Sequence, residues 1–214
     1  KWLNFNAGTG ESILNPQFLD IFDFIRGRYP RTEMEFLTNG LALRERVVDA
    51  VVGRLDRLHI SINAANESDY ERLIKGGKWN VLLKNMRYLQ QAVRRHSRPK
   101  ISASFVMMRW NAESAVRNLE FAAEVGASFV LFHHYYTPYL RDIHASDRKT
   151  LGEKFDKSES LYYDRELADR MIEDVERKAE ELGVRVQVPV RFSDKEYNIA
   201  YAFRTKDDAM KVCM

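Results

Sequence analysis

The chain has 214 residues, of which 45% are hydrophobic and 30% charged. This composition is that of a globular protein with one large or two small domains, and it excludes a disordered or fibrous chain. The 34 basic residues nearly balance the 31 acidic ones, so the charge gives no indication of nucleic-acid binding. No apolar run approaches the ~20 residues that a membrane span needs. The single cysteine, Cys213, excludes an internal disulfide framework and leads us to expect a cytoplasmic protein.

Short segments rich in β-branched and aromatic residues alternate with longer helical stretches along the chain. This alternation predicts an α/β fold of parallel strands joined by right-handed crossovers. The predicted strands cover residues 2–6, 33–38, 57–63, 100–108, 127–135 and 184–190. Hydrophobic residues at helical spacing predict helices over residues 79–93 and 164–182, the second ended by Gly183. Two more helices are expected, one beginning at Pro16 and one over residues 112–125, capped by Asn111 and ended by Gly126.

Side-chain alternation within the predicted strands favours a partial (β/α) barrel of the TIM type. In residues 57–63 the even positions are apolar and the odd positions polar, and in residues 184–190 four valines lie opposite Arg185 and Gln187. Parallel strands buried between two helical layers should be apolar on both faces. We therefore expect outer helices on the apolar faces and a polar bore that holds water or a polar ligand. The alternative is an incomplete sheet whose polar faces are exposed to solvent.

Four features carry candidate chemistry. Residues 8–11, with two glycines, follow the first predicted strand and could hold a charged or zwitterionic group, or form a plain βα turn that needs positive φ. His133 and His134 are adjacent on a strand and so point to opposite faces, which argues against joint metal ligation. His59 fits an interior hydrogen-bonded histidine better than a general base. The polar stretch over residues 137–163 is predicted to be a lid or substrate loop.

Taken in chain order, these segments resemble the radical S-adenosylmethionine (radical SAM) superfamily, in its branch with a C-terminal SPASM or twitch extension. The matching stretches are FNAGTGESILNP at 5–16, LTNG at 37–40, LHISINA at 58–64, YERLIKGG at 70–77 and SLYY at 160–163. Their order and spacing are more specific than any single one, and they extend over nearly the whole chain.

The resemblance implies roles for individual residues in binding the cofactor. The backbone of Thr9, Gly10 and Glu11 would bind the amino group of SAM, and Ser61 and Asn63 would hold its ribose. The family often has aspartate where this chain has Asn63, so the amide retains hydrogen bonding without the charge.

The resemblance implies roles for further residues, at positions where the matching motifs are less specific. Asn111, with Ser104 second, matches a polar residue that touches SAM after the next strand, and the backbone near residues 132–133 would lie by the adenine. Arg185 and Gln187 are candidate substrate contacts in the bore.

The family's Cys-x-x-x-Cys-x-x-Cys loop, which holds a [4Fe–4S] cluster, does not occur in this sequence. We expect it upstream of Lys1, so residues 1–205 would be an internal barrel fragment without its first strand and cluster loop. Residues 206–214 would begin the extension. There Cys213 would ligate an auxiliary cluster, or else be an ordinary thiol.

The resemblance implies SAM and a [4Fe–4S] cluster as cofactors, and an electron donor such as flavodoxin or ferredoxin. The full-length parent would cleave SAM reductively to a 5′-deoxyadenosyl radical and abstract hydrogen from a small-molecule or peptide substrate, while the fragment alone would be inactive. Two alternatives remain open. One is a phosphate-binding (β/α)-barrel lyase or isomerase, and the other is a degenerate, non-catalytic binding module.

Overall fold

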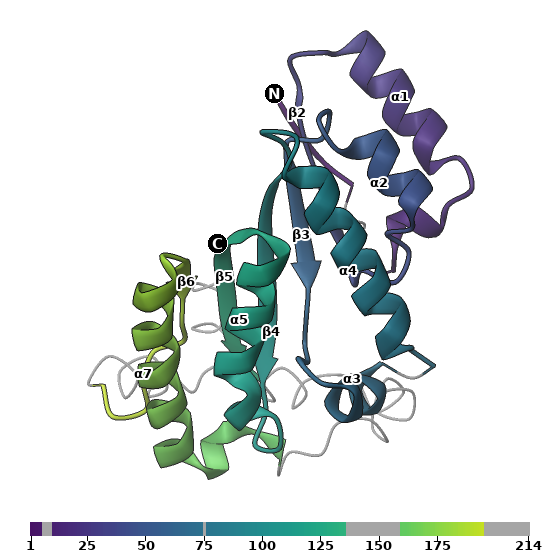
Figure 1. Ribbon diagram of the computed structural model, residues 1–214. Coiled ribbons are helices and arrows are strands. Elements are labelled where there is room, and N and C mark those ends of the chain that lie inside the picture. Colours follow the sequence, from purple (N-terminus) through teal and green to yellow (C-terminus); the bar gives the residue numbers. More distant parts are fainter. Residues whose placement is uncertain (6–9, 75, 136–158, 195–214) are drawn as a thin grey trace, which may run out of the picture.

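The computed structural model describes residues 1–5, 10–74, 76–135 and 159–194, which form one parallel sheet with helices packed against it (Figure 1). The strands are β1 (Trp2–Asn4), β2 (Glu33–Thr38), β3 (Arg57–Ser61), β4 (Lys100–Met107), β5 (Ala127–His134) and β6 (Arg185–Gln187). Their spatial order is their chain order, and every neighbouring pair is parallel. This confirms the predicted α/β fold. Among the described residues, β1 and β6 are the outermost strands and do not pair with each other, so the sheet is a partial barrel that does not close.

Helices follow the strands as the alternation predicts. They are α1 (Phe18–Arg28), α2 (Glu45–Val51), α3 (Glu67–Leu73), α4 (Trp79–Val93), α5 (Ala115–Val125) and α7 (Arg165–Leu182), with short 3-10 turns η1 (Ser12–Leu14), η2 (Ala112–Ser114) and η5 (Leu161–Tyr163). The predicted bounds of α4 are confirmed, and α7 begins one residue later than predicted. Gly126 and Gly183 end α5 and α7 with φ of +96° and +64°, the left-handed conformation expected of C-terminal glycines.

Two predicted helix starts are wrong. The side chain of Asn111 does not cap a helix: its Oδ1 accepts a hydrogen bond from Met108 N at 2.7 Å, and its Nδ2 donates to Val106 O at 3.0 Å. The amide therefore closes the turn after β4, and α5 begins only after η2. Pro16 does not open α1 either, because that helix begins at Phe18.

One face of the sheet forms the core with the helices, which lie together on that side in Figure 1. Its large side chains are almost completely buried, and Phe105 and Phe132 meet edge to face with ring centroids 5.8 Å apart. The other face, called here the open face, has half-buried or exposed side chains, apart from Ser104 at 9% exposure. The apolar and polar faces of the strands are thus sorted as their alternation predicted.

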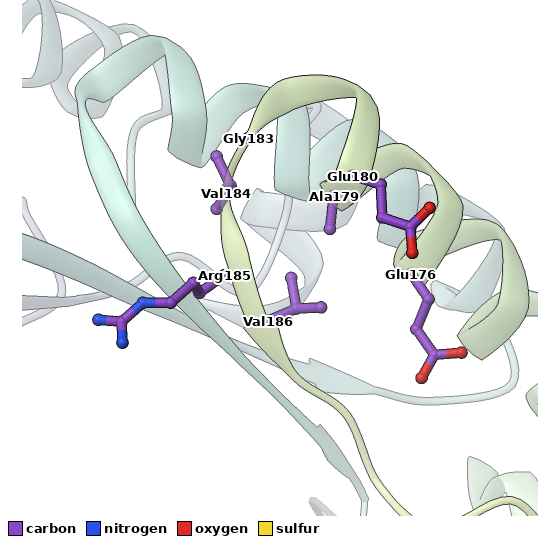
Figure 2. Close-up of a pocket in the computed structure, with 7 residues that line it drawn as sticks. All are labelled: Glu176, Ala179, Glu180, Gly183, Val184, Arg185 and Val186. Atoms are coloured by element: carbon purple, nitrogen blue, oxygen red, sulfur yellow. The ribbon is translucent and has the colours of Figure 1, made fainter.

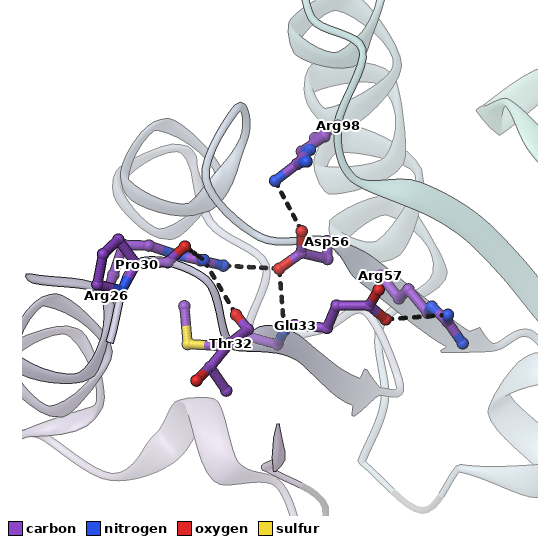
Figure 3. A network of polar contacts seen from close by, with 8 residues as sticks. Arg26, Pro30, Thr32, Glu33, Asp56, Arg57 and Arg98 are labelled. Atoms are coloured by element: carbon purple, nitrogen blue, oxygen red, sulfur yellow. Dashed lines mark hydrogen bonds and ion pairs between the residues drawn. The ribbon is translucent and has the colours of Figure 1, made fainter. Parts of the chain in front are cut away.

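The amino ends of the strands are held together by Asp56, between α2 and β3 (Figure 3). Its carboxylate accepts from Met34 N at 2.9 Å and pairs at 2.7 Å with both Arg26 of α1 and Arg98 before β4. Burial alone would raise the pKa of Asp56, but the Met34 hydrogen bond and the two arginines outweigh it and lower the pKa. Three segments distant in sequence therefore share one carboxylate.

None of the helices in the described ranges is both long and apolar enough to cross a membrane.

Candidate functional site

The carboxyl ends of the strands bring together most of the residues that the sequence singled out. In parallel α/β folds, ligands bind at this edge, because the loops that leave the strands converge there. The register places Ser61 beside Ser104, Ser104 beside Leu131, and Leu131 beside Gln187, in one row across the open face. At the usual strand spacing, this row extends over about 14 Å from β3 to β6.

Asn63 ties the end of β3 to β4. Its Oδ1 accepts a hydrogen bond from Val106 N at 3.1 Å, and its Nδ2 donates to the Ser61 hydroxyl at 3.0 Å. An amide has two donor hydrogens and two acceptor lone pairs. One of each is therefore left over, at a half-buried position where a ligand can meet them.

Glu11 ties the turn after β1 to the end of β2. Its Oε2 accepts from the Thr38 hydroxyl and from Asn39 N, both at 3.0 Å, and the Thr38 hydroxyl also accepts from Gly40 N. The other carboxylate oxygen, Oε1, is buried and has no hydrogen-bond partner within the described part of the chain. Glu11 thus places a negative charge with spare acceptor capacity at the carboxyl edge.

Gly10 immediately precedes this glutamate and has φ of +101°. A Cβ added there would meet no atom within 4 Å, so the need for glycine comes from the backbone conformation and not from crowding. Of the predicted SAM-binding turn, Gly10 and Glu11 are described, and Thr9 lies outside the described residues.

Histidines contribute polar groups to the middle of the open face. His59 Nδ1 lies 2.9 Å from the Ser102 hydroxyl, within hydrogen-bonding distance. Burial lowers the pKa of His59, an effect opposed by Glu35 and reinforced by His133. Burial also lowers the pKa of His133, so both rings are predominantly neutral near pH 7.

The two adjacent histidines lie on opposite faces of β5, as predicted from strand geometry. His133 is the register partner of Val106 on the open face, whereas His134 packs on the Phe192 ring, centroid to centroid 4.9 Å. Among the described residues, no three or more His, Cys, Asp or Glu side chains are grouped so that they could hold a metal ion.

The remaining candidates fall into three groups. Asn111 is fully buried and already engaged in the turn after β4, so its contact with SAM stays a prediction. Arg185 and Gln187 both lie on β6 with side chains exposed on the open face. Residues 137–158 of the predicted lid and Cys213 lie outside the described residues.

A scan against protein-family models matches residues 3–136 to the radical SAM superfamily. The matched range is more than half of the chain and contains most of β1, all of β2 to β5, and the carboxyl ends of these strands. The chain belongs to the radical SAM superfamily. No curated protein matches the sequence. Membership of this family generally implies SAM and a [4Fe–4S] cluster as cofactors.

Two solved structures share this radical SAM fold. One is described as TYW1 with a lysine–pyruvate adduct bound, with 16% identity and a TM-score of 0.53; the match covers 83% of this chain and 50% of that one. The other is a domain of pyruvate-formate lyase-activating enzyme from Bacteroides vulgatus, with 16% identity and a TM-score of 0.57, covering 88% of this chain and 98% of that one. This chain therefore spans half the length of the first structure.

The two cofactors of the radical SAM family fit this chain differently. A [4Fe–4S] cluster is held by cysteine thiolates, and the sequence has one cysteine, so these residues cannot hold the cluster by themselves. The carboxyl edge does fit SAM, because Glu11 offers an unpartnered buried oxygen and Asn63 an open donor and acceptor.

Sequence reasoning missed Thr38 as part of this site. The residue lies on the apolar face of β2 in alternation with Met34 and Phe36, and it is 1% exposed. A lone hydroxyl at the last position of an otherwise apolar strand face was the available signal, since a buried hydroxyl needs a partner. Here that partner is Glu11.

Proposed function

We propose that this chain is the SAM-binding core of a radical SAM enzyme. The methionyl end of SAM binds at the turn of Gly10 and Glu11, and its ribose binds against Ser61 and Asn63. When bound, SAM with a reduced [4Fe–4S] cluster supplies a 5′-deoxyadenosyl radical that abstracts hydrogen from the substrate. The observation that carries the proposal is that Glu11 of the glycine turn is held at the carboxyl end of β2, while Asn63 is held at the carboxyl end of the neighbouring β3.

The carboxylate of Glu11 makes the turn suitable for binding a cation. Its hydrogen bonds to Thr38 and Asn39 hold the carboxylate in place, and its free Oε1 keeps negative charge beside the backbone of Gly10. The α-ammonium group of SAM is attracted to this charge and donates to the acceptors of the turn. The carboxylate is therefore already fixed in position before SAM binds.

Ser61 and Asn63 suit a vicinal diol. Each ribose hydroxyl can donate and accept, and the Asn63 amide has one unused donor and one unused acceptor. The Ser61 hydroxyl accepts from Asn63, which leaves its own hydrogen available to a ligand. The missing charge of an aspartate is therefore compensated by an ordered amide.

The described residues of this chain do not supply the cluster thiolates, the electron donor or the substrate. Membership of the SPASM or twitch branch, with Cys213 as an auxiliary-cluster ligand, extends the proposal. It is supported by the SLYY stretch at 160–163, where Ser160 is buried and η5 leads into α7.

Asn63→Leu tests the proposal in the whole protein, loaded with iron and sulfide under anaerobic conditions. We expect SAM affinity to fall about 10-fold or more, because about two hydrogen bonds are lost, while iron and sulfide content is unchanged. Affinity is measured by calorimetry, with S-adenosylhomocysteine as a second ligand.

Asn63→Asp is the matched control, since a carboxylate can still accept from Val106 N and from the ribose. It should retain most of the SAM affinity. Unaltered affinity in Asn63→Leu would reject the ribose role, and a wild-type protein that binds neither iron nor SAM would reject the proposed function.

A further inference from the structure

Arg185 has a distinctive electrostatic position on the open face. Two rows of this face, one through His59, Ser102 and Phe129 and the other through Ser61 and Leu131, lead across the sheet to β6. Among the described side chains of these two rows, Arg185 is the one that carries a full charge at pH 7. The guanidinium has no ion pair or side-chain hydrogen bond with any other described residue.

Two carboxylates of α7 line the same groove as Arg185. Glu176 and Glu180 line this groove together with Val184, Arg185 and Val186, but Figure 2 shows the guanidinium of Arg185 directed away from both carboxylates. Glu176 also pairs with Arg191. The charge of Arg185 is therefore directed to the open face without an acidic partner among the described residues.

An apolar strip separates Arg185 from the proposed SAM site. Phe129 and Leu131 of β5 are the register partners of Arg185 and Gln187, and both are half-buried on the open face. Beyond them come the Ser102 and Ser104 hydroxyls of β4. From β6 to β4, the open face therefore presents first a cation and an amide, then an apolar surface, and then hydroxyl groups.

We propose that the substrate of this enzyme is an organic carboxylate with a hydrophobic body. Arg185 holds the carboxylate through its planar pair of N–H donors, assisted by the Gln187 amide, and the hydrophobic body lies over Phe129 and Leu131. At about 4.8 Å between strands, a body that crosses β5 to reach the Ser104 row is about 10 Å long. This assignment rests on the proposed function, because the SAM ribose at Ser61 then lies at the far end of the same row.

A carboxylate suits these groups better than a phosphate. Phosphate sites in proteins gather several backbone N–H donors or more than one cation. Among the described side chains of β6, the donors on the open face are one guanidinium and one amide, which match the two oxygens of a monoanionic carboxylate. The side chains beside them are apolar, which favours a ligand whose charge is confined to one end.

The test measures binding of phenylbutyrate, and of the neutral phenylbutyramide, to the whole protein by calorimetry or ligand-observed NMR. The wild type should bind the carboxylate about 10-fold more tightly than the amide. Arg185→Gln should remove that preference, and Arg185→Lys should restore part of it. Arg170→Gln, which removes another exposed arginine from α7, should behave like the wild type.

SAM affinity is measured on the same proteins and should be unchanged by Arg185→Gln. If the wild type does not bind SAM at all, the proposed function is refuted, independently of the result for the carboxylate. Equal affinity for the acid and the amide, or an unchanged preference in Arg185→Gln, would overturn the carboxylate assignment. It would also be overturned if inorganic phosphate displaced phenylbutyrate with equal or higher affinity.

Discussion

The amino and carboxyl edges of the sheet use half-buried carboxylates in opposite ways. At the amino edge both oxygens of Asp56 are engaged, by one backbone N–H and two arginines from three separate segments. At the carboxyl edge Glu11 uses one oxygen for two donors and leaves the other buried without a described partner. A saturated network stabilises the fold, whereas unused hydrogen-bonding capacity in an ordered group is available to a ligand. The comparison separates residues that hold the barrel together from residues that we expect to bind SAM.

The largest expected effect is on folding, at the amino edge. Asp56→Ala should lower the free energy of unfolding by about 2–4 kcal/mol, because it leaves Met34 N and Nη2 of Arg26 without their acceptor. Urea unfolding followed by circular dichroism measures this. SAM affinity below the melting temperature should be unchanged, and a variant of wild-type stability would show that Asp56 does not hold this edge together.

Glu11→Gln should have the opposite profile. We expect SAM affinity to fall about 10-fold, since the negative charge beside the ammonium group is lost, while the free energy of unfolding changes by about 1 kcal/mol. Calorimetry and urea unfolding on the same preparation separate the two effects. If stability falls like that of Asp56→Ala and SAM affinity does not, Glu11 belongs with the structural carboxylates.

A smaller, pH-dependent effect is expected at His134, on the helix side of the carboxyl edge. Burial lowers its pKa to about 4, against opposing effects of the Val190 backbone and Asp169. Between pH 6.5, the ordinary pKa of histidine, and pH 4, the unfolded chain therefore binds a proton that the folded chain does not. The contribution of neutral His134 to stability is fully present above pH 6.5 and is lost as the pH falls toward 4.

The slope from this residue is at most about 1.4 kcal/mol per pH unit. His134→Phe should remove it, which melting temperatures between pH 5 and pH 8 can measure. The same slope in wild type and variant would assign the acid sensitivity to other groups.

The smallest effect is expected from Glu33→Ala, which breaks the ion pair with Arg57 at 3.1 Å near the amino edge. Both side chains are more than half exposed, so the loss should be below about 1 kcal/mol and should shrink further in high salt. A loss as large as that of Asp56→Ala would mean that burial is not what distinguishes the two pairs.

The sequence predicted the strands and helices better than it predicted the side-chain hydrogen bonds at the ends of the strands. Alternation located all six strands, and a helix as long and periodic as Trp79–Val93 was predicted with its bounds. The seven-residue helices α2 and α3 are too short to show a clear period. Asn111 looked like a cap, but its amide found backbone partners in the preceding turn.

The candidate site shows the same limit. Ser61, Ser104, Arg185 and Gln187 were placed on a shared face by parity, and the register confirms that placement. Asp56 carried no such signal, because its partners are 22 to 42 residues away and an isolated aspartate looks like any surface residue. For Ser61, Ser104, Arg185 and Gln187, the proposed roles toward SAM and substrate stay predictions.

Hydrogen–deuterium exchange of the whole protein with and without SAM tests the central claim most directly. Amides of residues 10–14, 61–66 and 106–108 should exchange more slowly when SAM is present, while those around Asp56 and Arg98 should not change. Protection confined to the amino edge, or no protection at the three carboxyl-edge segments while SAM is bound, would contradict the account.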